Sequence, residues 1–417
     1  MTSLKNLQFL GNHLNTINDS NHEYINVQII NEYTETNNAP QAIIFNQVKT
    51  SNIIDVCSDY YLSVVRWNIQ SNLPVLIPDM VLYPILQQPG TLDTQYKLTM
   101  FYSTLTGDLP LDISYTNPNV PYLECTVYFK PETISANYLN NSFISPQTKN
   151  DTLNNPFFYI KSVDTFLDML NSTIFTFMNQ LYTVTGGATW THLPYFIWDA
   201  GSGKITYNNP NSSPTGGTLG PGSLKWFLAV NQSLYNLLNT FRFKYYPRNA
   251  GNAAIYPEAS NCRYLLDTNI LDPLTTEAGI GEYSSYLQQS SSVVNWSPVS
   301  SIVFQTGLPV EAQISGAPAN LNLKPATNAS TYQQQNTTKI LTDFAIPFSI
   351  GTEATNQQIY YTPTSEYRLI DLLGNNNLNQ LTVQIFWRDK FGGIHPMTLD
   401  AGAAADMLIL LRKKSFN

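Results

Sequence analysis

Residues 381–414, LTVQIFWRDKFGGIHPMTLDAGAAADMLILLRKK, decide the fold of this chain. The stretch opens with an alternation in which every second residue is a large apolar side chain: Leu381, Val383, Ile385 and Trp387. A period of two predicts a β-strand with one face in a core, and it turns Phe386 to the opposite face, toward an insert or a neighbouring subunit. Residues 389–393 then read as a hairpin loop, because their two glycines can take positive φ, and residues 394–399 pair back.

The same stretch ends in a continuously apolar run, Met407 to Leu411, followed at once by Arg412, Lys413 and Lys414. A run with no polar face predicts a strand that lies between other strands and is covered on both sides. The three basic residues can hardly be buried together, so they should emerge at one edge of the sheet. They are interpreted in two ways, as a solubilising cap on an apolar strand or as a contact with packaged nucleic acid or an acidic partner.

The composition is that of a large chain with few charges. It has 417 residues, 43% of them apolar and 12% charged, against about 25% charged in an ordinary soluble protein. This length predicts one large all-β domain with an elaboration, or two domains. A surface poor in charge and rich in aromatic rings suits interfaces, although an AT-rich coding sequence would also enrich Asn and Tyr.

Charge and cysteine content exclude several classes of protein. The net charge of −8 gives no general affinity for nucleic acids. The isolated cysteines Cys57, Cys125 and Cys262 argue against a disulfide framework and against a zinc site. No N-terminal stretch has the layout of a signal peptide, and no apolar run approaches the roughly 18 residues of a membrane span. We therefore expect a protein made and kept in a reducing compartment.

The chain predicts two blocks of strands around a helical middle. Residues 1–20 are polar with scattered leucines and read as an arm that only a neighbour would order. Residues 21–150 and 290–417 hold short, regularly spaced strands, which favour a sandwich or barrel, with 309–335 as an exposed linker. Residues 151–289 form an inserted region with two amphipathic helices.

The two helices are predicted from apolar residues that recur in steps of three and four. The first covers 163–181, with Ser162 as N-cap and Asp164 in its first turn, and the second covers 224–241, starting after Ser223. Two strands are expected within 292–306, interrupted near Pro298.

No pattern of catalytic or metal-binding residues stands out. The four histidines, His13, His22, His192 and His395, lie far apart, and no HExxH or GxSxG sequence occurs. Residues 201–204, GSGK, resemble part of a phosphate-binding loop, but Ile205 stands where that motif needs Ser or Thr. We therefore expect no enzymatic activity, no metal and no cofactor.

Five blocks along the chain carry a family resemblance. They are DYYLSVVRW (59–67) with LPVLIP (73–78), SIVF (301–304) with LPV (308–310), ILTDF (340–344), EYRLIDL (366–372), and the stretch 381–414. In order and spacing they resemble the penton proteins of polinton-like viruses, adintoviruses and related small double-stranded DNA viruses. The similar parts cover roughly 22–80 and 290–414. No Arg-Gly-Asp sequence occurs, so the integrin-binding role of some adenoviral pentons is not carried over.

The resemblance implies a jelly-roll of two packed sheets with an inserted domain, assembling as a homopentamer at icosahedral vertices of a virion. It implies contacts with a neighbouring major capsid protein, an interface role for Phe386, and an interior, genome-facing position for Arg412, Lys413 and Lys414. Two alternatives stay open: a double jelly-roll major capsid protein, and a receptor- or glycan-binding protein that uses tyrosine and tryptophan platforms.

Overall fold

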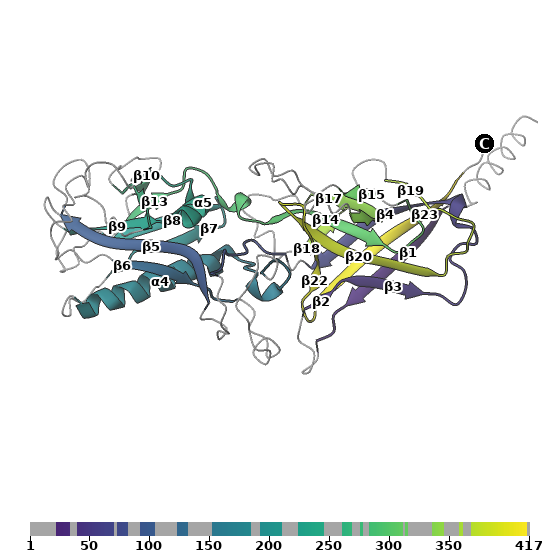
Figure 1. The fold of residues 1–417 in the computed structure, drawn as a ribbon, viewed down its shortest axis with the longest axis horizontal. Coiled ribbons are helices and arrows are strands. Elements are labelled where there is room, and N and C mark those ends of the chain that lie inside the picture. Colours follow the sequence, from purple (N-terminus) through teal and green to yellow (C-terminus); the bar gives the residue numbers. More distant parts are fainter. Residues whose placement is uncertain are drawn as a thin grey trace, which may run out of the picture. The chain divides into compact units, whose positions relative to one another are not determined.

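In the part of the chain that the structure describes, the fold is mostly antiparallel β-sheet with two α-helices. Figure 1 shows the arrangement of these elements. The computed structural model describes residues 22–33, 40–70, 73–81, 92–104, 123–131, 152–184, 192–210, 224–245, 261–268, 276–277, 283–311, 313–315, 336–345, 358–361 and 368–414. The predicted arm 1–20 and most of the predicted linker 309–335 lie outside these residues. The chain forms two compact units, of which unit 1 comprises Met1–Asn72, Val299–Ile346 and Gln357–Asn417, and unit 2 comprises Leu73–Pro298 and Pro347–Asn356.

Unit 1 contains a sheet built around its longest strand, β4, and named here the β4 sheet. The carboxyl-terminal strand β23 lies between β1 and β4, antiparallel to both, so the prediction that residues 407–411 lie between other strands is confirmed. The members of the sheet are β1 (His22–Ile30), β23 (Ala404–Lys413), β4 (Tyr60–Gln70), β18 (Gln358–Tyr361) and the short β19 (Ile370–Asp371).

The second sheet of unit 1 is named the β20 sheet, after the strand predicted from the alternation at 381–388. It is antiparallel throughout, and β20 turns back into β21 through a tight hairpin. Its members are β17 (Ile340–Phe344), β14 (Val299–Thr306), β20 (Gln380–Asp389), β21 (Ile394–Pro396) and β3 (Ile44–Val48). Two small two-stranded ribbons are the remaining described strands of unit 1. They are β2 (Gln41–Ala42) with β22 (Thr398–Leu399), and β15 (Gln313–Ser315) with β16 (Asn336–Thr338).

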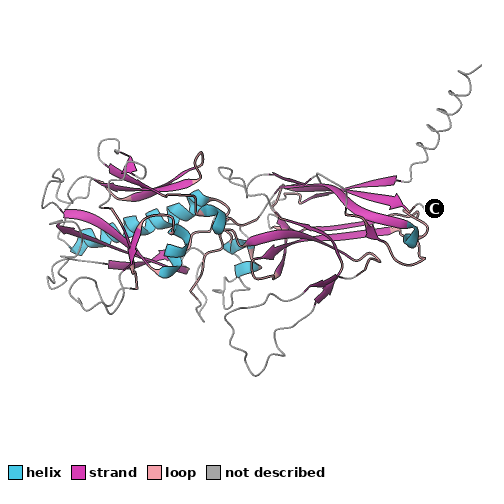
Figure 2. Cartoon of the chain, turned by 90° about the horizontal axis from the view of Figure 1, so that it is seen from above, coloured by secondary structure: helices cyan, strands magenta, loops and turns pink. Residues whose placement is uncertain are grey.

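The two sheets of unit 1 share one core. Trp67 on β4 packs edge-on against Phe304 and Phe344 of the β20 sheet, with ring centroids 5.3 and 5.1 Å apart. The predicted core side chains of β20 are all buried, including Trp387 at 1% exposure. The predicted β-sandwich is therefore present, as two layers of strands (Figure 2). Every second residue of β20 is buried in its interior.

Unit 2 combines two antiparallel sheets with the helices. One sheet has the order β10 (Phe243–Tyr245), β11 (Tyr264–Leu266), β9 (Leu224–Val230), β5 (Asp93–Thr104), β6 (Leu123–Tyr128). The other has the order β12 (Thr276–Glu277), β13 (Tyr283–Leu287), β8 (Lys204–Pro210), β7 (Tyr195–Asp199). The helices are α4 (Val163–Val184) and α5 (Gln232–Leu238), and short 3-10 turns occur at Cys57–Asp59, Pro156–Phe158 and Val293–Asn295.

Helix α4 forms where its apolar spacing predicts. The Ser162 hydroxyl accepts a hydrogen bond from the backbone N–H of Asp164 at 3.1 Å, which satisfies one of the free N–H groups at the helix start. The apolar stripe is buried against β6 and β7, as at Phe166 and Leu170. The Asn171 side chain also bonds both backbone groups of Phe196 on β7, donating to its carbonyl at 2.9 Å and accepting from its N–H at 2.8 Å.

The predicted second helix is wrong over its first half. Residues 224–230 form strand β9, which pairs with β5 over seven positions, and only 232–238 are helical. The cap is Asn231, whose side chain accepts from the N–H of Leu234, and not Ser223. A short apolar run satisfies a helical and an extended pattern equally, so pairing with β5 decides between them.

The predicted boundary of the inserted region also differs from the compact units. The main segment of unit 2 is Leu73–Pro298, whereas the sequence suggested 151–289. Strands β5 and β6 pair with β9 and with each other, so they belong to unit 2 and not to the sandwich. Residues 293–295 form a 3-10 turn instead of a strand, which leaves β14 as the one strand in 292–306.

Candidate functional site

The described residues contain no arrangement suited to catalysis by a metal. No group of three His, Cys, Asp or Glu side chains in the described ranges could hold an ion. Residues 201–203 lie in the turn between β7 and β8, and Lys204 begins β8. Gly203 takes a φ of 67°, and Asp199 accepts hydrogen bonds from the backbone N–H groups of Gly201 and Ser202. The GSGK sequence is thus the tip of a hairpin. None of the helices in the described part of the chain is long and apolar enough to cross a bilayer.

His395 lies in a buried cluster at the β20–β21 hairpin. Its Nε2 lies 2.8 Å from Oδ2 of Asp389, and both side chains are almost fully buried. The other oxygen of Asp389 accepts the backbone N–H groups of Phe391 and Gly393 at 2.7 and 2.9 Å. The partners of this carboxylate within the described ranges belong to the hairpin itself, so the cluster shapes the turn.

Of the three predicted basic side chains, two are exposed and the third forms an ion pair. Arg412 and Lys413 are exposed on the last residues of β23, opposite Tyr61 and Tyr60 of β4. Lys414 differs, because its Nζ lies 2.6 Å from Oδ1 of Asp371 and 4.9 Å above the ring of Tyr61.

Carboxylates also surround the start of β4. The pKa of Tyr60 is raised above its ordinary value, first by partial burial and then by the negative charges of Glu23, Asp55 and Asp59. Acidic groups of the same chain therefore lie near the end of β23, where Lys413 is opposite Tyr60 in the strand register.

The outer face of the β20 sheet is the side that points away from the sandwich core. Phe386 lies on this face and is half-buried, as the alternation predicted, while its neighbours Ile385 and Trp387 are buried inside. Asp343 lies on the same face and forms ion pairs with Arg368 at 2.7 Å and with Arg388 at 3.8 Å. Two apolar side chains of β3 are exposed there, Ile44 at 49% and Val48 at 65%.

The outer face of the β4 sheet carries its own exposed apolar side chains. Tyr24 and Ile30 on β1 are 59% and 62% exposed, and Tyr360 on β18 is 66% exposed. Each alternates with buried residues of its strand, such as Ile25 at 7%. Both faces of the sandwich therefore offer large apolar side chains to solvent, which marks them as candidate contact surfaces.

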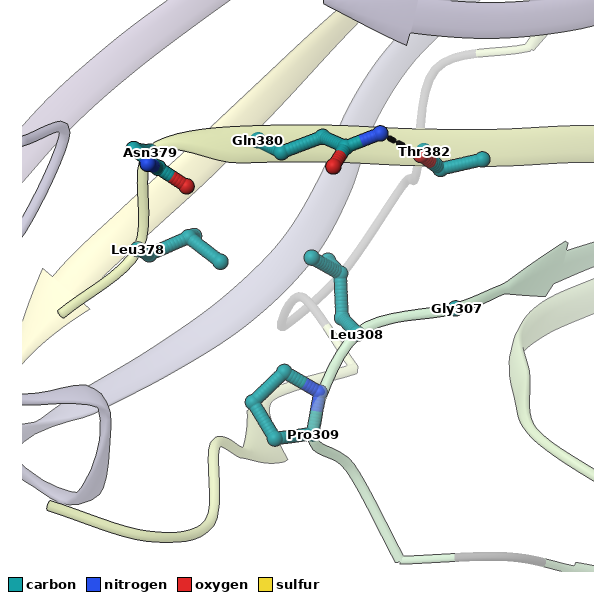
Figure 3. A pocket seen from close by; sticks show the side chains of 7 residues that line it. All are labelled: Gly307, Leu308, Pro309, Leu378, Asn379, Gln380 and Thr382. Carbon is teal, nitrogen blue, oxygen red and sulfur yellow. Dashed lines mark hydrogen bonds between the residues drawn. The ribbon is translucent and has the colours of Figure 1, made fainter. Parts of the chain in front are cut away.

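A pocket of about 350 Å³ lies on the outer face of the β20 sheet, where β14 and β20 diverge (Figure 3). Leu308 and Leu378 extend into the same space beside Pro309, and the side chains of Asn379, Gln380 and Thr382 lie along the strand above them (Figure 3). Lys339 donates from Nζ to the carbonyl of Leu308 at 3.0 Å and holds the loop of this pocket. The sequence did not reveal this pocket, because its two walls are about seventy residues apart along the chain. The one local signal was Pro309, which has no N–H to donate to a neighbouring strand and so indicates the end of β14.

Comparisons with known proteins agree with a structural role. The family model for Sputnik minor capsid protein V18/19 matches residues 24–413. Structural protein V19 of Sputnik virophage is 25% identical over 155 residues, covering 37% of this chain and 67% of that protein. A second Sputnik virophage protein, V18, is 26% identical over 147 residues, covering 34% of this chain and 75% of V18.

Two solved structures share the fold. A chain of the Sputnik virophage cryo-EM structure aligns with a TM-score of 0.65 and 20% identity, covering 94% of this chain and 98% of that one. The mavirus penton protein aligns with a TM-score of 0.52 and 14% identity, covering 94% of this chain and 99% of that one.

The family model and the two solved structures extend over nearly the whole chain, and the family model is that of a minor capsid protein. The expectation that the chain is a capsid protein and not an enzyme is confirmed, since its family is one of capsid components. The chain belongs to the family of Sputnik minor capsid protein V18/19, and it is a structural protein of the virion capsid.

Proposed function

We propose that this protein is a penton, which closes the vertices of an icosahedral double-stranded DNA virus as a homopentamer. The observation that carries the proposal is the match of residues 24–413 to a minor capsid family, together with the fold shared with the mavirus penton protein. The sandwich of unit 1 is then a jelly-roll, and unit 2 is a domain inserted into it. The sequence blocks that resemble pentons of polinton-like viruses and adintoviruses support the same proposal.

The two outer faces of the sandwich supply the surfaces that a ring requires. A cyclic ring of more than two subunits uses a head-to-tail contact, in which one surface of each copy meets a different surface of the next. The outer face of the β4 sheet exposes Tyr24, Ile30 and Tyr360, and the outer face of the β20 sheet exposes Ile44 and Val48 beside the half-buried Phe386. Aromatic side chains are enriched at such contacts.

Further partners follow from the position of a penton in a shell. A vertex subunit contacts the neighbouring major capsid protein. Its interior side meets the packaged genome, to which Arg412 and Lys413 would present exposed positive charge. Lys414 contributes less to that contact, because its ammonium group is paired with Asp371.

Native mass spectrometry of the purified protein tests the proposal. A closed assembly of five 46.8 kDa chains is expected. A trimer would indicate a major capsid protein instead, and a chain that stays monomeric at every concentration and binds glycans would indicate a receptor-binding protein. Negative-stain images of the same sample should show rings with fivefold symmetry.

A further inference from the structure

We infer that the pocket on the outer face of the β20 sheet receives the side chain of Tyr24 from a second copy of this chain. The inference rests on the proposed function and names the residues of the ring contact. The pocket has an apolar floor made by Leu308, Leu378 and Pro309. Asn379, Gln380 and Thr382 line its polar side, and no acidic or basic residue is among the lining residues. This chemistry suits an aromatic ring with one uncharged polar atom, as in a tyrosine side chain.

The rim of the pocket carries exposed apolar side chains that a partner could cover. Val48 of β3 is opposite Gln380 of β20 in the strand register, and its side chain is 65% exposed. Leu373 donates its N–H to the carbonyl of Pro309, and its side chain is 47% exposed. Exposed apolar side chains around a pocket with buried walls are typical of an anchor site, where a central side chain inserts and surrounding contacts exclude water.

Tyr24 is an exposed aromatic residue in a position to insert. It lies on β1, at the margin of the β4 sheet, and 59% of its surface is exposed although Ile25 beside it is buried. A tyrosine held on a strand loses little freedom on binding and offers a large apolar area, which makes it an effective anchor at interfaces.

The pocket and Tyr24 lie toward the same end of the sandwich. Tyr24 is opposite Leu410, three residues before the end of β23, and β23 ends beside Tyr60 at the start of β4. Two backbone hydrogen bonds connect Tyr60 with the pocket, because Leu372 donates to the carbonyl of Tyr60 and the next residue, Leu373, donates to the carbonyl of Pro309.

Position along the strands decides which exposed residue can insert. If the strands run along the ring axis, rotation carries each residue to the same height in the next copy, so a protruding side chain and its pocket must share that height. Tyr24 satisfies this condition. Ile30 lies six residues farther along β1, about 20 Å away, and Tyr360 pairs with Asn68 near the opposite end of β4.

The pocket and Tyr24 lie on different sheets, and this meets the requirement of a head-to-tail ring for two different surfaces. Gln380 and Thr382 alternate with the buried Leu381, so the pocket opens on the outer face of the β20 sheet. Tyr24 lies on the outer face of the β4 sheet. Each copy therefore carries one pocket and one tyrosine, and the contact can repeat from copy to copy until the ring closes.

Disulfide trapping tests the contact directly. Chains carrying both Tyr24→Cys and Gln380→Cys are expected to form a ladder of covalent oligomers ending at the ring size under mild oxidation. A mixture of the two single variants is expected to form covalent dimers only. Chains with Tyr360→Cys and Gln380→Cys, and chains with only the native cysteines, serve as controls and should stay uncoupled. Coupling through Tyr360→Cys but not through Tyr24→Cys would overturn the inference.

The stability of the ring gives a second measurement. Tyr24→Ala should raise the dissociation midpoint concentration of the ring about 10-fold or more, and Tyr24→Phe should retain most of the contact. Gln380→Trp fills the pocket while Tyr24 stays unchanged, and it should weaken the ring similarly. Tyr360→Ala should leave the stability of the ring unchanged. Thermal unfolding of each monomer shows that the variants fold. Wild-type rings that are insensitive to Tyr24→Ala would overturn the contact but leave the penton proposal standing, whereas absence of any ring would overturn both.

Discussion

The indole ring of Trp387 lies against the imidazole ring of His395, with centroids 4.4 Å apart, across the paired strands β20 and β21. The two residues are opposite each other in the strand register, and His395 lies 2.8 Å from the buried carboxylate of Asp389. The hairpin turn is thus attached to the core of the sandwich through an aromatic pair and a buried polar pair. A substitution at Trp387 should therefore alter the packing of the hairpin turn, and a substitution in the turn should alter the packing around Trp387.

Trp387→Ala is expected to lower the free energy of unfolding by about 3–5 kcal/mol, the usual cost of truncating a large buried aromatic side chain. The indole is 1% exposed, so the substitution leaves a cavity next to His395. Denaturant unfolding of the monomer measures the effect. Phe386→Ala is the matched control on the other face, and it should cost less in the monomer and act on assembly. The reverse ranking would mean that the register of β20 is wrong.

Gly393→Ala is expected to destabilise the hairpin by about 1–3 kcal/mol, because an added methyl group would overpack a tight site. A Cβ at this position would lie 2.7 Å from Oδ2 of Asp389 and 3.1 Å from Nε2 of His395. Gly307→Ala is the control, since a Cβ there would meet nothing within 4 Å. Equal thermal midpoints for the two variants would argue against the packing described at Asp389.

Asn171→Ala is expected to cost about 1–3 kcal/mol of stability, because two backbone groups of Phe196 would lose their side-chain partner. The Asn171 amide is the link between helix α4 and strand β7. Amide hydrogen exchange should show faster exchange at the N–H of Phe196 in this variant. Ser172→Ala on the exposed side of the same helix should change neither quantity.

The double variant Arg412→Gln with Lys413→Gln is expected to leave the unfolding free energy within about 0.5 kcal/mol of wild type, since both side chains are exposed. The variant should bind double-stranded DNA more weakly at low salt, and the dependence of binding on salt should flatten. Lys414→Met, which breaks the pair with Asp371, should affect stability more than DNA binding. DNA binding that is unchanged in the double variant would remove the basis for a genome contact.

A chain that stops before Met407 is expected not to fold, because β1 and β4 would both lose their shared neighbour. A chain that stops after Leu411 should fold and still form rings. Circular dichroism and size-exclusion chromatography separate these outcomes. Retention of the wild-type thermal midpoint by the shorter chain would mean that β23 is dispensable.

The strongest parts of the sequence prediction are those in which the local pattern has one interpretation. The alternation of 381–388 has the period of a strand, and the steps of three and four in 163–181 have the period of a helix, so both elements form as predicted. The prediction fails at 224–230, where a short apolar run is compatible with both periods and pairing with β5 selects the strand. The compact units also differ from the predicted ranges of the inserted region, since strand pairing places β5 and β6 with β9 in unit 2.

The sequence by itself determined that the fold is mostly β with helices, which face of β20 is buried and that β23 lies inside a sheet, because each depends on side chains that are close along the chain. Tertiary structure alone decided which residues from distant segments meet: Trp67 with Phe344, Asp371 with Lys414, and Leu308 with Leu378. Such contacts are between segments that the chain brings together only on folding, and their partners are chosen by strand register and packing. No local period encodes that choice.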